Sequence, residues 1–195
     1  MIIRDYTPED EKEWLKCRLL SFYHSSYYDD IIHEKPKYSN EMIDLIAVKD
    51  GDIIGFLEIE YEQDPKDVCY LEGDRGGVIW NLGVLPDYQG KLVATKLFQE
   101  AIHRCKILGL KRLEAWTQDD TPSNRWYEKN RFILKESYLN VYANWCECKK
   151  NNMIQNVGEI YGIRSLNFEA PIHRKDELKE KFLKVLEVKL YELNL

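Results

Sequence analysis

The sequence predicts a mixed α/β fold, in which a central mixed β-sheet is flanked by helices. Short β-type runs of apolar residues alternate along the chain with segments whose apolar residues recur every three or four positions. The Asp50-Gly51 step between two β-type runs is typical of a hairpin. The expected order of elements is neither repetitive nor that of a doubly wound sheet, so we expect a single mixed sheet.

The N-terminal part begins with a short strand at Ile2 and Ile3. A helix follows, with Thr7 as its N-cap and Pro8 at its first helical position. Residues 21–37 are polar and are expected to end this helix and form a loop. The strands expected next lie over residues 43–48, 53–61 and 78–85.

The middle of the chain predicts two helices separated by a strand. The first helix begins at Gln89, keeps its apolar residues at helical spacing and ends at Gly109 as its C-cap. A second helix runs from Thr121 to about Lys129 by the same combination of cap and proline. The strands expected around it lie over residues 111–117 and 132–142.

The last fifty residues differ in character, so we expect a domain over residues 1–143 and a C-terminal strand and helix extension over 144–195. Residues 144–157 are predicted to form a connector or a weak hairpin, and 160–168 a further strand. One long amphipathic helix is expected over 173–193, with an apolar stripe at Leu178, Phe182, Leu186 and Leu190. Such a stripe must be buried, either on the protein's own sheet or in a homodimer formed through this helix.

Composition excludes several classes of protein. Lys and Arg total 28 against 34 Asp and Glu, a net charge of -6 that is unfavourable for binding nucleic acid. No apolar stretch is long enough to span a membrane, and the N-terminus has no export signal. The five cysteines are scattered without a C-x-x-C pair, so we expect reduced thiols, no metal site and a cytoplasmic location.

Residues 82–94 predict a strand that passes through a tight loop into a helix. The first turn of a helix presents free backbone N–H groups and a partial positive charge, which together bind anions. Gly90 allows the backbone of this loop to approach a ligand closely. The segment therefore indicates a phosphate or pyrophosphate site, the alternative being a plain strand, loop and helix without a ligand.

This segment and a second one resemble the motifs of the GNAT superfamily of N-acetyltransferases. The acyl-CoA-binding loop of that family reads Arg or Gln, x, x, Gly, x, Gly or Ala. The positions that match it here are Gln89, Gly90, Lys91, Leu92, Val93 and Ala94, with Leu92 in place of the inner glycine. Residues 120–132 are similar to the family's Asn-x-x-Ala-x-x-x-Tyr-Glu-Lys-x-Gly-Phe, with Asp120, Ser123 and Arg131 in place of Asn, Ala and Gly.

Leu92 and Arg131 stand where the family motifs have glycine, so the backbone conformation that these two positions require matters. Leucine is tolerated at position 92 if the residue has a helical φ, and then only close approach to a ligand suffers. Asn130, which tolerates the left-handed conformation, would take over the turn at Arg131 if the turn shifts by one residue.

The resemblance implies an enzyme that transfers an acetyl group from acetyl-CoA, as cosubstrate, directly to a primary amine of a small cationic molecule or a peptide. It implies that the backbone at Leu82, Gly83 and Val84, the loop Gln89–Ala94, and Asp120 with Ser123 bind the CoA. Tyr127 is implied as the acid that protonates the departing thiolate. The amine must lose a proton with a pKa of about 10.4, and the candidate bases are Glu114 and Glu58.

The acceptor is expected to bind at the loop that follows the first helix. This loop offers Tyr27, Tyr28 and Asp29, and aromatic faces beside carboxylates suit a cation. Glu58 shares one face of the strand 53–61 with Glu60 and Glu62, which would extend the negative mouth. The alternative is a catalytically silent CoA-binding module of the same fold, which Leu92 and Arg131 keep open.

Overall fold

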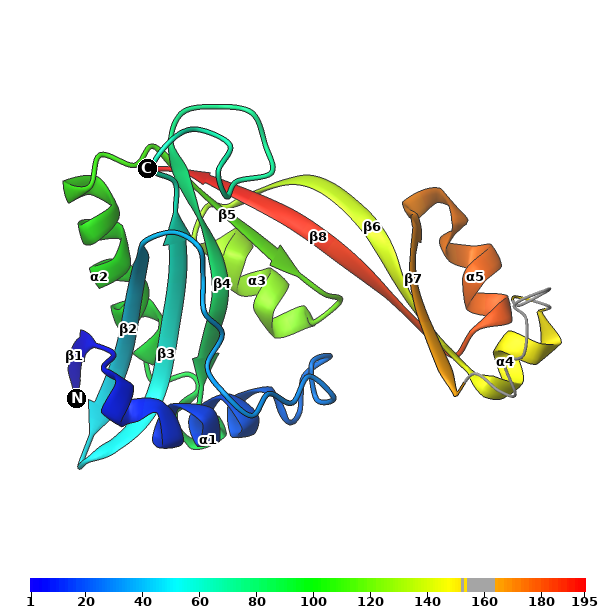
Figure 1. The fold of residues 1–195 in the computed structure, drawn as a ribbon, viewed down its shortest axis with the longest axis horizontal. Coiled ribbons are helices and arrows are strands. Elements are labelled where there is room, and N and C mark those ends of the chain that lie inside the picture. The colour runs from blue at the N-terminus through cyan, green and yellow to red at the C-terminus, as the bar shows by residue number, and fades with distance from the viewer. Residues whose placement is uncertain (152, 154–163) are drawn as a thin grey trace.

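The computed structural model describes residues 1–151, 153 and 164–195, and these form a mixed sheet with helices on both faces (Figure 1). The strands are β1 (Ile2–Asp5), β2 (Met42–Lys49), β3 (Asp52–Tyr61), β4 (Gly76–Val84), β5 (Arg112–Thr117), β6 (Ile133–Asn144), β7 (Ser165–Pro171) and β8 (Lys184–Asn194). The helices are α1 (Glu11–Phe22), α2 (Val93–Ile107), α3 (Thr121–Lys129), α4 (Trp145–Lys150) and α5 (Lys175–Lys181). The strand order is β1-β2-β3-β4-β5-β8-β6-β7, which confirms the mixed α/β sheet.

Local signals in the sequence located the N-terminal elements correctly. Asp50 and Gly51 have φ values of 54° and 94°, the left-handed pair that a tight hairpin requires, and they join β2 to β3. The backbone N–H of Thr7 donates to the carboxylate of Asp10 at 2.9 Å, which closes the N-terminus of the short 3-10 turn leading into α1. Gly109 has a φ of 74° and ends α2 as predicted.

The sheet has a hydrophobic core on each face. Leu57 and Ile59 of β3 pack on the α2 side, together with Leu97 of α2. Phe56, which directly precedes Leu57, points to the α1 side, where its ring lies 5.2 Å from that of Trp14. The predicted alternation along β3 is therefore confirmed, and the sheet separates the α1 face from the α2 face.

The long helix predicted over residues 173–193 is wrong. The chain forms only the short α5, leaves it at Phe182 with φ −133° and ψ 138°, and continues as β8. β8 lies between β5 and β6 and pairs antiparallel with both, so it satisfies two sheet edges at once. The spacing misled because a step of four is even, so Leu186 and Leu190 share a face in a strand as well as in a helix. The surface expected for a dimer through that helix is therefore not formed.

Strands β6 and β8 run beyond the body of the sheet as a two-stranded ribbon that carries β7, α4 and α5 as a lobe (Figure 1). Leu139, Val141 and Leu178 are among the buried residues of its separate small core. Sequence reasoning missed α4, although Asn144 and Glu147 cap it reciprocally at 2.9 and 3.1 Å.

The structure tests part of what the sequence predicts for the strand over residues 160–168 and for the domain division after residue 143. The strand expected over residues 160–168 is found as β7, while residues 160–163 lie outside the described part of the chain. The division after residue 143 stays a prediction, although β8 returns to the sheet of the N-terminal part.

Arg131 itself adopts the left-handed conformation after α3, with a φ of 68°, whereas Asn130 has a φ of −88°. The shift of the turn onto Asn130 is therefore wrong. A left-handed conformation costs a residue with a Cβ about 1–2 kcal/mol. The hydrogen bond of 2.8 Å from the Asn130 side chain to the Trp126 carbonyl explains why Asn130 stays in the last turn instead.

We predict that Arg131→Gly raises the free energy of unfolding by about 0.5–1 kcal/mol, because relief of backbone strain exceeds the added entropy of glycine in the unfolded chain. The melting temperature should rise by about 2 °C. Asn130→Gly is the matched control and should lower it, since Asn130 is not left-handed and loses its hydrogen bond. Urea unfolding of both variants checks this, and a destabilised Arg131→Gly would contradict it.

Candidate functional site

Strands β4 and β5 diverge in the middle of the sheet. They pair in parallel only from Gly76 opposite Arg112 to Ile79 opposite Ala115, after which β4 continues to Val84 and β5 to Thr117. The register between β3 and β4 shifts at the same level. Among the described residues, the edge of β4 at Leu82, Gly83 and Val84 that faces β5 has no strand partner. An extended ligand with amide groups can pair along such an edge.

The loop at the end of β4 leads to the N-terminus of α2. The helix begins at Val93, later than the predicted Gln89, and has no side-chain cap. Leu92 has φ 63° and ψ 16°, so residue 92 is left-handed and not helical, and its side chain is 64% exposed. A glycine at this position would thus serve the backbone conformation as well as close approach.

The N-terminus of α2 is suited to an anion. The first-turn N–H groups, which include those of Val93 and Ala94, have no capping side chain. A Cβ added to Gly90, whose φ is 71°, would meet nothing within 4 Å, so the loop is open there. The ammonium groups of Lys49 and Lys91 both lie over the ring of Tyr88, at 5.3 and 5.5 Å, and add positive charge. These residues fit a phosphate or pyrophosphate group.

Tyr127 of α3 lies in the core on the α2 face of the sheet. Its ring stacks on that of Tyr191 at 5.5 Å and meets Phe132 edge-on at 5.1 Å. Burial raises the pKa of Tyr127 well above the ordinary range, and the neighbouring Tyr27 and Tyr191 raise it further. No hydrogen bond among the described residues uses its hydroxyl, so the protonated oxygen is available as a donor.

Asp120 and Ser123 hold the start of α3. The carboxylate of Asp120 accepts hydrogen bonds from the backbone N–H of Ser123, at 3.1 Å, and from its hydroxyl. Asp120 is therefore the N-cap of α3, one residue before the predicted Thr121. The first turn is also tied to β8, because the hydroxyl of Tyr191 donates to the side-chain oxygen of Asn124 at 2.9 Å.

Tyr27 reaches the end of β5 from the opposite, α1 face. Its hydroxyl accepts a hydrogen bond of 2.8 Å from the backbone N–H of Gln118, and its ring packs on Phe22. Tyr127 belongs to the core on the α2 side, so the two tyrosines lie on opposite faces of the sheet. The divergence of β4 and β5 is thus approached by one tyrosine from each face.

Glu58 is fully buried on the α1 face of β3. Its carboxylate pairs with the ammonium of Lys35 and accepts a hydrogen bond of 2.6 Å from the side chain of Asn81. Asn81 lies opposite Glu58 on β4, beyond the point where β4 stops pairing with β5. Lys35 also pairs with Asp44 at 3.1 Å and lies 4.2 Å over the ring of Trp14. Burial lowers the pKa of Lys35 in spite of these partners. Sequence reasoning missed Lys35 because it lies in a loop without periodicity.

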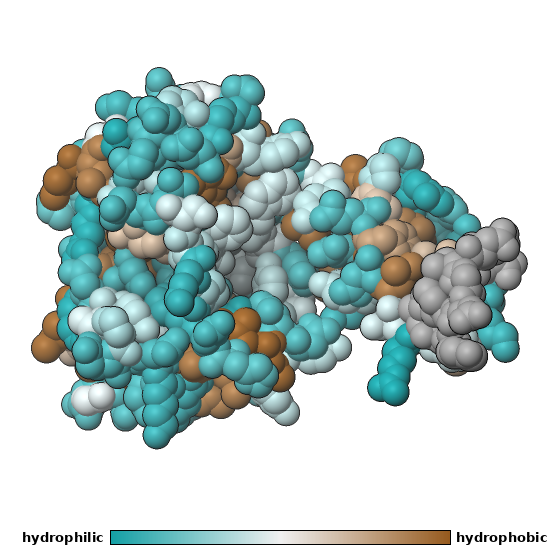
Figure 2. All heavy atoms as spheres, viewed as in Figure 1, coloured by the Kyte–Doolittle hydropathy of each residue, from teal (hydrophilic) through white to brown (hydrophobic). Residues whose placement is uncertain are grey.

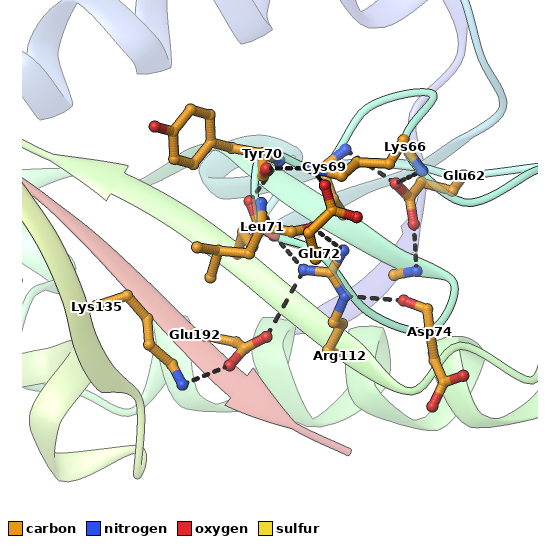
Figure 3. Close-up of polar contacts among 12 residues, drawn as sticks. Glu62, Lys66, Cys69, Tyr70, Leu71, Glu72, Asp74, Arg112, Lys135 and Glu192 are labelled. Carbon is orange, nitrogen blue, oxygen red and sulfur yellow. Dashed lines mark hydrogen bonds and ion pairs between the residues drawn. The ribbon is translucent and has the colours of Figure 1, made fainter.

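Glu114 is also fully buried, but it is tied into a different network. Its carboxylate accepts the backbone N–H groups of Tyr70 and Leu71 at 2.8 and 3.0 Å and pairs with the guanidinium of Arg112. Arg112 in turn donates to the carbonyls of Leu71 and Asp74 at 2.7 and 2.8 Å (Figure 3). The pair thus anchors the loop between β3 and β4 on β5.

The negative mouth expected from Glu58, Glu60 and Glu62 is wrong, because all three carboxylates are buried. Glu62 accepts the N–H groups of Lys66 and Gly76, each at 2.7 Å, and these bonds lower its pKa although burial alone would raise it. Glu60 accepts the indole N–H of Trp80 at 2.8 Å. Both carboxylates position loops and strands rather than face solvent.

A cleft of about 620 Å³ lies between the loop after α1 and the lobe. The space-filling view shows the molecule hollowed between the body and the lobe (Figure 2). The predicted acceptor residues Tyr27, Tyr28 and Asp29 lie in its wall. The wall on the other side includes Tyr142 of β6 and Lys184 of β8, neither of which sequence reasoning singled out.

All five cysteines are free. In residues 1–151, 153 and 164–195, no three His, Cys, Asp or Glu side chains are grouped to hold a metal ion. Within the same ranges, none of the helices has the length and apolar character to cross a membrane.

Sequence comparison finds relatives for this arrangement. Residues 2–132 match the acetyltransferase (GNAT) family. Mycothiol acetyltransferase of Sanguibacter keddieii is 34% identical over 85 residues, which are 43% of this chain and 25% of that protein. The chain thus spans about a quarter of the length of this curated relative.

Solved structures share the fold. An acetyltransferase of the GNAT family from Streptococcus pneumoniae has a TM-score of 0.61 at 18% identity, covering 100% of this chain and 99% of that one. The PaiA N-acetyltransferase of Thermoplasma acidophilum, solved in complex with coenzyme A, has a TM-score of 0.53 at 16% identity, covering 69% of this chain and 90% of that one.

Proposed function

Because this chain belongs to the acetyltransferase (GNAT) family, we propose that it transfers an acetyl group from acetyl-CoA to a primary amine. The observation that carries the proposal is the divergence of β4 and β5, which leaves the edge Leu82–Val84 unpaired among the described residues. The loop after that edge leads to the uncapped N-terminus of α2, and Tyr27 and Tyr127 lie on the two faces of the sheet. Donor, reaction centre and acceptor cleft can therefore be contiguous.

The donor site of this proposal consists of backbone groups. Leu82, Gly83 and Val84 offer N–H and C=O groups to the amides of the pantetheine arm, and the loop Gln89–Ala94 offers its N–H groups to the pyrophosphate. Acetyl-CoA supplies the thioester carbonyl that the amine attacks. Asp120 and Ser123 contribute by capping α3, which holds Tyr127 in place.

We predict that acetyl-CoA stabilises the protein. At 100 times its dissociation constant a ligand adds about 2.7 kcal/mol to the free energy of unfolding. For a chain of this length the melting temperature should rise by about 5–10 °C. Adenosine at the same concentration lacks the pyrophosphate and should have little effect. Equal curves with and without millimolar acetyl-CoA in a thermal-shift assay would contradict the donor site.

Tyr127 fits the acid that protonates the departing thiolate. Its hydroxyl is protonated at neutral pH, as that of any tyrosine is, and its ring is held by Tyr191 and Phe132. The hydroxyl takes part in no hydrogen bond among the described residues, so its proton is free for this use. The hydroxyl would donate its proton to the sulfur as the C–S bond breaks and negative charge develops there.

Tyr127→Phe should lower kcat by about 10²–10⁴-fold, the range for loss of a positioned acid, and leave the affinity for acetyl-CoA nearly unchanged. Steady-state kinetics with a thiol-detecting reagent, together with calorimetric titration of acetyl-CoA, separates the two quantities. Tyr61→Phe removes another tyrosine hydroxyl, on β3, and serves as control. A wild-type protein that binds acetyl-CoA but acetylates none of a panel of amines would instead be a silent CoA-binding module.

Of the two carboxylates, Glu58 fits the base better than Glu114. Glu58 accepts a hydrogen bond from Asn81, which lies where β4 no longer pairs with β5 and next to the backbone proposed to hold the donor. Both carboxylates pair with a cation, Glu58 with Lys35, whose pKa burial lowers, and Glu114 with Arg112. Glu114 in addition accepts two backbone N–H groups of the loop that it anchors. Glu58 is buried, so the proton of the acceptor reaches it through an intervening water or hydroxyl, for which Tyr38 at 3.4 Å is placed.

Glu58→Gln should lower kcat/KM at pH 7, and the deficit should shrink towards pH 10, where the amine loses its proton without help. Glu114→Gln should lower the free energy of unfolding by about 3 kcal/mol, because the buried guanidinium of Arg112 loses its carboxylate partner. Any loss of activity in this variant should be independent of pH. The pH profiles of both variants and their urea unfolding curves test the assignment. The opposite pattern would make Glu114 the base.

A further inference from the structure

The cleft between the loop after α1 and the lobe contains a cation of the protein itself, the side chain of Lys184. The ammonium of Lys184, at the start of β8, lies 2.8 Å from the carboxylate of Asp29. It also lies 4.1 Å over the ring of Tyr142 and 4.7 Å over the ring of Tyr28. Two segments distant in sequence, the loop after α1 and β6, thus form a cage of two aromatic faces and one carboxylate around the ammonium of a third segment. We call this the ammonium cage.

The chemistry of the ammonium cage is that of cation recognition. Aromatic faces attract an ammonium through their quadrupoles, and a carboxylate adds a directional ion pair. Burial alone would lower the pKa of Lys184, but Asp29, Tyr28 and Tyr142 together raise it above its ordinary value. The cage therefore stabilises the charged form of an amine.

The charges that line the cleft favour a cation. Asp30 is neutralised by Arg18 at 2.6 Å, and Glu147 accepts the backbone N–H groups of Asn144 and Leu183. Lys184 is the one lysine or arginine among the described residues of the lining. If its ammonium leaves the cage, Asp29 and Glu147 remain without a positive partner there, so the cleft presents negative charge to whatever replaces it.

The ammonium cage is connected to the proposed reaction centre through Gln118. The side chain of Gln118 donates to the hydroxyl of Tyr142 at 3.2 Å, while its backbone N–H donates to Tyr27 at the end of β5. The ammonium cage and the end of β5 are thus linked through this one residue.

We propose that Tyr28, Tyr142 and Asp29 form a cation subsite for the acceptor, and that the acceptor displaces Lys184 from it. This rests on the proposed acetyltransferase function and specifies its substrate class, an amine that carries a second positive charge away from the nitrogen that is acetylated. Lys184 is the resident occupant of the subsite in the free protein. Because it is tethered, it competes at a high effective concentration, so it weakens the binding of acceptors that fill the cage poorly.

The experiment uses tetramethylammonium, which cannot be acetylated, and isothermal titration without acetyl-CoA. Lys184→Met removes the resident charge and keeps most of the side-chain stem, so binding of tetramethylammonium should tighten by about tenfold. Adding Asp29→Asn, or Tyr142→Leu, to this variant should abolish the gain, whereas adding Tyr142→Phe should keep it. Lys181→Met removes a lysine that pairs with Glu177 outside the cleft and should leave binding unchanged.

Unchanged or weaker binding to Lys184→Met would show that Lys184 is only a link between the lobe and the loop, and would overturn the proposal. If Lys184→Met does not fold, Asp29→Asn in the wild-type background should abolish binding of the probe, and retained binding would overturn it equally. The titration needs no CoA. If acetyl-CoA does not raise the melting temperature, the acetyltransferase proposal is refuted and the titration result is unaffected. If the titration gives the contradicting result, the cation subsite is refuted and the acetyltransferase proposal is unaffected.

Discussion

The divergence of β4 and β5 after Ile79 and Ala115 is the constraint on which the rest of the structure depends. Parallel strands that separate leave backbone donors and acceptors without partners, and each must find another partner or face a ligand. Just after β5 the backbone N–H of Gln118 donates to the hydroxyl of Tyr27, while the described residues leave the end of β4 open on its β5 side. The helices α2 and α3 cover one face of this opening and the loop after α1 covers the other, so residues from both faces meet there.

The C-terminal segment completes the sheet on the edge of β5 that faces away from β4. β8 is an interior strand, and the ribbon that it forms with β6 carries the lobe. Lys184 and Tyr142 of this ribbon make the far wall of the cleft whose near wall is the loop after α1. The cleft therefore needs the C-terminal residues, even though the family match ends at residue 132.

The features that could be predicted from the sequence are the turns and helix ends, which depend on residues close to one another in the chain. The Asp50-Gly51 hairpin and the end of α2 at Gly109 follow from residues with restricted or permissive backbones. The partners of β8 could not be predicted, because an even apolar spacing satisfies both helix and strand and only the open edges of β5 and β6 decide. The partners of Glu58 and Glu114 are equally non-local, since Lys35 and the Tyr70–Leu71 backbone come from loops without a pattern. The positions of the carboxylates were predictable, and their contacts were not.

The start of α2 shows how the donor site and the stability of the protein are related. An N-cap residue usually has an extended backbone and a side chain that accepts a first-turn N–H group, whereas Leu92 is left-handed and apolar. The protein thus carries backbone strain and uncapped N–H groups in the same loop. An anion at this position would satisfy those N–H groups, which ties the local cost in the free protein to ligand binding. Arg131 has the same backbone strain but no such open donors described beside it, so its strain is a matter of folding alone.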